Sequence, residues 1–159
     1  MTYLVTYFSR TGNTAALAHQ IAMRLGVAEE PILEHGRGDG IWGSLTGAVG
    51  AALGRPSPVG TPQNDPAGFD LVLIGTPVWA AAVPPAVNGW IDAHRDKCKQ
   101  VAFFATSGGV GFDRTFSRMR KRIGKAPVAR LAVNADRLNS DETEEALDHF
   151  ISDLKATQS

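Results

Sequence analysis

The sequence has little cysteine, no excess of either charge and no long apolar run. Its 159 residues contain one cysteine, Cys98, which excludes an intrachain disulfide and a cysteine-based metal site. Basic and acidic residues number 16 each, so the net charge of +0 indicates no general attraction to nucleic acid or acidic lipid. No apolar stretch reaches about 18 residues, so no membrane-spanning helix is predicted.

Several signals and motifs are also absent. The starting residues MTYLVTYF lack the basic start and long apolar segment of a signal peptide. Together with the single cysteine, this predicts a cytoplasmic protein. The chain has no G-x-x-x-x-G-K-[ST] motif, and its first turn lacks G-x-G-x-x-G, which argues against P-loop and dinucleotide sites. The four histidines show no metal-ligand spacing, so no metal site is predicted.

Short apolar runs rich in β-branched and aromatic residues alternate with helical patterns. The runs cover residues 2–8, 69–75, 100–106 and 128–134, and a weaker strand is expected at 31–35. Helices are predicted from residue 13 to about Gly26, after Pro84, over 112–123, and after Asp141, which has capping-box spacing with Glu144.

This alternation is typical of parallel βαβ units. Because the runs are continuously apolar, the strands are expected to be covered on both faces. The sequence therefore predicts an α/β fold in one domain over residues 1–159, with a doubly wound, five-stranded parallel sheet and helices on both faces.

A glycine-rich insert is predicted at about 36–68, which holds nine of the 17 glycines. Within it, Trp42, Leu45, Val49 and Leu53 have helical spacing. Two interpretations stay open. One is a short helix packed against the edge of the domain; the other is a helix that binds a partner or forms a homodimer through its small residues.

The turn after the first run, SRTGNT at residues 9–14, concentrates hydroxyl groups between a strand and a helix. Its hydroxyls can donate to an anion, Gly12 permits a close backbone approach, and the helix N-terminus adds free N–H groups. A phosphate site is one interpretation, and a hydroxyl-rich turn with an N-cap is the other.

Two further loops leave strand ends with unusual composition. The loop GTPVWAAAVPP, residues 75–85, places Trp79 just past a strand, where it serves either as core or as a platform for a ring. The loop ATSGGVGF, residues 105–112, has glycines that let backbone approach a flat ligand, or that simply form a turn. In a doubly wound sheet, ligands bind beyond the carboxyl ends of the strands, so all three loops belong to one predicted site.

With these loops in this order, the sequence resembles the flavodoxin family, which binds FMN. The resemblance implies that the first loop wraps the FMN phosphate, that the second flanks one face of the isoalloxazine, and that the third closes its pyrimidine side and other face. The cofactor-binding residues so implied are Ser9, Arg10, Thr11, Gly12, Asn13, Thr14, Thr76, Pro77, Val78, Trp79, Ala80, Thr106, Ser107, Gly108, Gly109 and Phe112. No catalytic side chain is implied, since the cofactor performs the redox chemistry.

The resemblance implies either electron transfer or a small FMN-dependent oxidoreductase, with a protein, quinone or flavin acceptor and NAD(P)H as a possible donor. The alternative is a non-catalytic module that binds a partner through the insert or a basic helix.

Two departures from the family are visible. Ala80 follows Trp79 where glycine is common, because the turn can need a positive φ. The charges are also segregated, with Arg114, Arg118, Arg120, Lys121, Arg122 and Lys125 on one helix and six acids on the last, which indicates either solvated faces or docking of an acidic partner or an NADPH phosphate.

Overall fold

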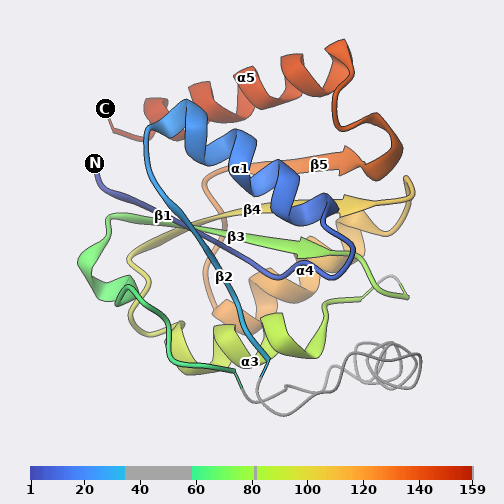
Figure 1. Cartoon of the computed structure of the whole chain (residues 1–159). Coiled ribbons are helices and arrows are strands. Elements are labelled where there is room, and N and C mark those ends of the chain that lie inside the picture. The colour runs from blue at the N-terminus through green and yellow to red at the C-terminus, as the bar shows by residue number, and fades with distance from the viewer. Residues whose placement is uncertain (35–58, 81, 159) are drawn as a thin grey trace.

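The computed structural model describes residues 1–34, 59–80 and 82–158, and it contains one parallel sheet (Figure 1). Its five strands lie in the order β2-β1-β3-β4-β5, and every pairing is parallel. The strands are β1 (Tyr3–Tyr7), β2 (Glu29–Pro31), β3 (Leu71–Pro77), β4 (Gln100–Ser107) and β5 (Arg130–Asn134). The fold predicted from the sequence is confirmed in class and strand number.

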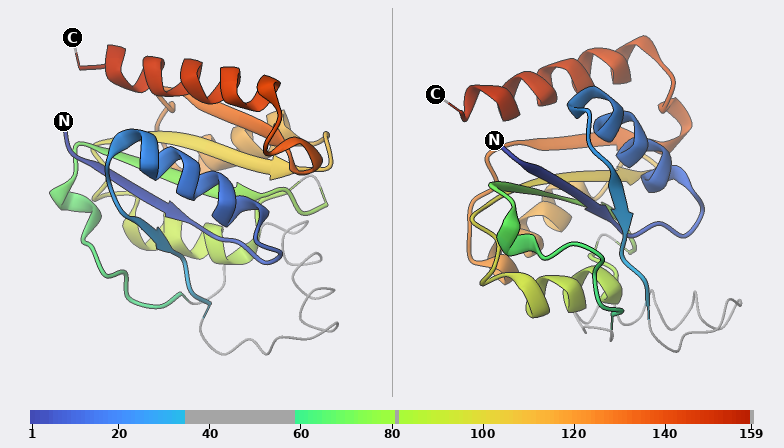
Figure 2. Two further views of the ribbon diagram at one scale, coloured as in Figure 1. Left: turned by 45° about the horizontal axis from the view of Figure 1, so that its top comes forward. Right: turned by 60° about the vertical axis from the view of Figure 1, so that its left-hand side comes forward.

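Helices cover both faces of the sheet (Figures 1 and 2). On one face lie α1 (Asn13–Leu25) and α5 (Asp141–Ala156); on the other lie α3 (Pro85–His94) and α4 (Phe112–Ile123). Short 3₁₀ turns occur at Pro66–Gly68 and Ala135–Arg137. This three-layer arrangement explains why β3 and β4 read as continuous apolar runs, since both faces of each strand are buried.

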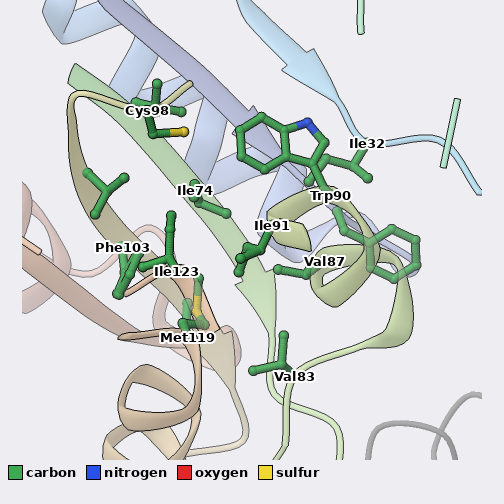
Figure 3. Packing of buried hydrophobic residues seen from close by; sticks show 14 of the residues in the cluster. Ile32, Ile74, Val83, Val87, Trp90, Ile91, Cys98, Phe103, Met119 and Ile123 are labelled. Atoms are coloured by element: carbon green, nitrogen blue, oxygen red, sulfur yellow. The ribbon is translucent and has the colours of Figure 1, made fainter. Parts of the chain in front are cut away.

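Each face has its own apolar core. Between the sheet and α1 and α5, the core includes Leu17, Ile21 and Phe104. Between the sheet and α3 and α4, it includes Trp90, Ile91 and Phe103, which Figure 3 shows with their neighbours. These two cores hold the strands rigidly, so the loops at the strand ends are presented from a fixed scaffold.

The helix signals in the sequence were correct with one exception. Gly26 ends α1 in the left-handed region at φ 68°, where glycine is favoured. At α5 the predicted capping residue, Asp141, is wrong by one position. Ser140 is the N-cap, and its hydroxyl accepts a hydrogen bond of 3.2 Å from the Thr143 N–H. Because serine and aspartate both cap helices, the sequence alone did not separate these neighbours.

The second strand was also misplaced, since β2 covers Glu29–Pro31 and not residues 31–35. Glu30 is buried in this edge strand, where its carboxylate accepts hydrogen bonds from the backbone N–H groups of Gln63 and Asn64 at 2.8 and 3.1 Å. The strand was predicted from apolar residues, and a glutamate that is buried because it is hydrogen-bonded is not detected in that way. This is the physical reason for the error.

The helix expected around Trp42 to Leu53 lies outside the described residues. The described end of the insert returns to the sheet through an antiparallel bridge between Glu34 and Val59. In the part of the chain that the structure describes, no helix is long and apolar enough to cross a bilayer. The same residues contain no cluster of three metal-ligating side chains.

Candidate functional site

The three loops singled out in the sequence follow β1, β3 and β4, which are neighbours in the sheet. Because the strands are parallel, all three loops lie at the carboxyl-terminal end of the sheet, toward which the arrows point in Figure 1. The chain leaves β1 toward β2 on one side and later returns to β3 on the other side of β1. This change of direction at β1 and β3 is the place where doubly wound sheets bind ligands.

The first loop is a tight turn closed by its own side chains. Gly12, at φ 94°, is the N-cap of α1, and its N–H donates to the Ser9 hydroxyl at 3.2 Å. A Cβ added at Gly12 would meet nothing within 4 Å, so the backbone here borders open space. The N-terminus of α1 carries no side-chain cap and no acidic residue in its first turn. Its free N–H groups and positive dipole end therefore suit an anion.

Arg10 connects the first loop to the second. Its guanidinium carbon lies 5.6 Å from the ring centroid of Trp79, in a cation–π contact. One guanidinium nitrogen, Nη1, is buried without a hydrogen-bond partner in the described structure. An unpartnered donor of a charged group is costly to bury, and a phosphate in the neighbouring turn would supply the missing acceptor. The donor set therefore fits the predicted cofactor phosphate.

The second loop is a tight hairpin built around Trp79. Trp79 and Ala82 exchange two backbone hydrogen bonds, at 3.0 and 2.8 Å. Ala80, between them, has φ 49° and is the one non-glycine residue with a positive φ in the described ranges. The sequence left Trp79 as either a core residue or a platform, and in the structure its side chain is half-buried. It packs edge-on against Phe8, with ring centroids 5.5 Å apart.

The third loop is shaped by its glycines and by Ser107. The Ser107 hydroxyl accepts from the Gly109 N–H and donates to the Val110 carbonyl, both at 3.0 Å. Gly109 (φ 112°) and Gly111 (φ 87°) adopt backbone angles that favour glycine. Val110, at the tip, is 78% exposed, and the sequence analysis missed it. An apolar side chain inside a glycine-rich turn was the signal that could have found it.

The loops are joined to one another by two contacts at Thr106. Its hydroxyl lies 2.8 Å from that of Thr14, and both side chains are buried. Its carbonyl accepts from the Val78 N–H at 3.0 Å. The first loop thus meets the third through side chains, and the second meets the third through backbone. These bonds fix the spacing of the three loops without any ligand.

The structure brings most of the predicted residues together. Phe112 and Thr76 are described separately because both also have contacts within the protein itself. Phe112 lies in the first turn of α4 and stacks on Phe116, with centroids 6.5 Å apart. Phe112 and Gly109 also line a cavity of about 250 Å³ beside β5 and α5. Thr76 is fully buried, with its hydroxyl 2.8 Å from the Pro77 carbonyl. The cofactor contacts of all these residues stay a prediction.

The electrostatics of the site are simple. Residues 9–14, 75–80 and 105–112 include a single ionisable side chain, Arg10. These ranges supply hydroxyls, backbone N–H groups and one cation, but no general acid, base or nucleophile. An arrangement of this kind can bind an anion and orient a flat group, while the chemistry must come from what is bound.

A family model for flavodoxins matches residues 45–154. The chain belongs to the flavodoxin family. The matched range includes the second and third loops of the site but not residues 9–14, so the assignment does not depend on the motif in the first loop. None of the curated proteins compared with the chain matches its sequence.

Solved structures share the fold at low sequence identity. A flavoprotein from Lactobacillus acidophilus NCFM, crystallised in complex with FMN, is 21% identical with a TM-score of 0.72, over 89% of this chain and 97% of that one. Oxidised flavodoxin 2 from Bacillus cereus is 15% identical with a TM-score of 0.61, over 98% and 99%. A WrbA-like flavodoxin from Agrobacterium tumefaciens is 14% identical with a TM-score of 0.61, over 99% of each chain.

Proposed function

We propose that this flavodoxin-family protein binds FMN across its three loops and passes electrons between a donor and an acceptor. Membership of the family implies FMN as the cofactor. The observation that supports the proposal most is the mutual bonding of the loops through Thr106, which holds a phosphate-type turn beside an aromatic platform.

The roles of the residues follow from their chemistry. The hydroxyls and N–H groups of residues 9–14 would hold the phosphate, with Arg10 adding the one positive charge. Trp79 would flank the ring system, and the backbone of residues 106–109 would border its polar edge. When bound, FMN supplies the capacity to accept and return electrons. The protein positions it and limits the access of water.

The family resemblance is compatible with electron transfer and with an oxidoreductase, and the low acidity of the loops favours a reductase-type role over a dedicated low-potential carrier. With no carboxylate in the three loops, a reduced and negatively charged flavin would meet little repulsion. We propose NAD(P)H as the donor and a quinone, flavin or partner protein as the acceptor. The competing function is a binding module that acts without redox chemistry.

Anaerobic reduction of the FMN-loaded protein tests this proposal. NADH and NADPH are added in turn, bleaching of the flavin absorbance is followed, and a quinone is then added to restore it. Free FMN at the same concentration is the control. Bleaching and recovery faster than those of free FMN are expected. Rates no greater than those of free FMN, with both donors and all quinones, would contradict an oxidoreductase role.

A further inference from the structure

A second cavity, of about 300 Å³, lies between α4 and the start of β5, and none of its lining residues belongs to the three loops. Asp113, Phe116, Ser117 and Arg120 of α4 line it, and Ala126, Pro127 and Arg130 close its other side. Its volume is at the lower end of the range for small-molecule sites. Because β5 is the edge strand of the sheet, no other strand among the described residues lies beside it.

The basic residues around this cavity differ in how they are engaged. Outside the cavity, Arg122 pairs with Asp92 at 3.2 Å, and the Lys125 ammonium donates to the Arg95 and Cys98 carbonyls at 3.0 and 2.6 Å. Arg120 and Arg130, which line the cavity, are exposed, and their side chains form no hydrogen bond or ion pair with any described residue. The guanidinium donors of Arg120 and Arg130 are therefore available to a bound anion.

The cavity has an aromatic wall and a polarity along its length. The guanidinium of Arg130 lies over the Phe116 ring, 6.0 Å from its centroid. Asp113 and Arg120 are seven positions apart on α4, which places them about 10 Å apart along the helix axis, on the same face. Along α4 the cavity thus offers the Arg120 guanidinium at one end and the Asp113 carboxylate at the other, with Ser117 between them in the sequence and Arg130 over the Phe116 ring.

We propose that this cavity binds a phosphorylated nucleoside. Arg120 and Arg130 would hold the phosphate, since guanidinium groups bind phosphate oxygens in pairs. The Asp113 carboxylate would accept a hydrogen bond from an exocyclic amino group of the base. If the cavity held only guanidinium groups, any small anion would bind to them. Because Asp113 also lines the cavity, the preferred ligand carries a phosphate and, at a distance from it, a hydrogen-bond donor such as an amino group.

AMP is the probe, and adenosine, inorganic phosphate and IMP are the matched comparisons. Binding to the protein as purified, with excess FMN present, is measured by calorimetry, and the site is located by amide chemical shifts. AMP is expected to bind more tightly than the other three, with shifts on residues 113–130. Arg120→Gln or Arg130→Gln should weaken AMP binding about tenfold or more, because each removes a charged hydrogen-bond donor.

Arg118→Gln is the control, since Arg118 is an exposed arginine of α4 outside the cavity. It should leave AMP binding unchanged. Equal losses in all three variants would show general charge attraction and overturn the proposal. Binding of AMP no tighter than phosphate or IMP would overturn the nucleoside part, and shifts confined to residues 9–14 would place AMP in the cofactor loop instead. Because the FMN titration is separate, failure here leaves the proposed flavin function untouched.

Discussion

The hydroxyl oxygens of Thr14 and Thr106 lie 2.8 Å apart, although 92 positions separate them in the chain. Both side chains are buried, at 1% and 3% exposure, so neither hydroxyl has water as an alternative partner. Their bond uses one of two hydroxyl protons. The pair thus joins the first loop to the third and still has one proton to donate.

Replacing both members of this pair should cost less stability than the two single replacements added together. Thr14→Val or Thr106→Val alone leaves a buried hydroxyl unpaired, which costs about 1–3 kcal/mol of folding free energy. The double variant removes both polar groups, so its loss should be smaller than the sum of the two single losses. Denaturant unfolding of the four proteins measures this coupling. Strictly additive losses would show that the hydroxyls do not bond.

Trp79 should be the tryptophan that reports FMN binding. Flavins quench tryptophan emission at contact, and an aromatic stack adds about 0.5–1.5 kcal/mol beyond area burial. Trp79→Ala should abolish most of the FMN-dependent quenching and weaken binding. Trp90→Phe is the control, because Trp90 is buried in the core under α3. If quenching disappears with Trp90→Phe and survives in Trp79→Ala, the platform lies elsewhere.

Ala80→Gly should stabilise the protein. The left-handed region costs alanine about 1–2 kcal/mol, and Ala80 has φ 49°. Glycine removes that cost. However, a glycine loses more backbone freedom on folding than an alanine does, and this lowers stability by about 0.5–1 kcal/mol. A net gain of up to about 1.5 kcal/mol is therefore expected in thermal or denaturant unfolding. Ala82→Gly, in the same hairpin but without a positive φ, should destabilise. A loss of stability in both variants would contradict the strain at Ala80.

His94 should make stability fall as the pH drops below neutral. Burial lowers its pKa, with the nearby Lys97 charge adding to the effect, and its Nδ1 is buried without a partner. Below the ordinary histidine pKa of about 6.5, the unfolded chain binds a proton that the folded protein does not. Protons therefore favour unfolding. His94→Gln should flatten the decline in stability between about pH 7 and pH 5.5. An unchanged slope would mean that other groups carry the decline.

Much of the fold was readable from the sequence because it depends on local patterns. Gly26 and Pro85 marked the end of α1 and the start of α3, and the apolar runs marked the buried strands. The edge strand β2 was not readable, because Glu30 is buried through bonds to residues more than 30 positions away.

The sequence predicted which loops form the candidate site, but it did not predict the contacts between their side chains. The resemblance implied that Thr14 contacts the phosphate, which stays a prediction, but the bond of its hydroxyl to Thr106 was not foreseen. The contact between Arg10 and Trp79 was likewise invisible, since it depends on the position of the hairpin beside the first loop. Motifs identify residue types near a strand end, but the partner of each side chain is fixed only by the packing of the sheet.

Titration of the FMN-free protein with FMN and with riboflavin tests the central claim most directly, on the wild type and on Thr11→Val. Thr11 is an exposed residue of the first loop, so its hydroxyl is available to a phosphate. One FMN should bind per chain, more tightly than riboflavin. Thr11→Val should cost about 1–3 kcal/mol of FMN binding and leave riboflavin binding nearly unchanged. A protein that takes up no FMN, or that binds both flavins equally and loses both equally in Thr11→Val, would contradict the account.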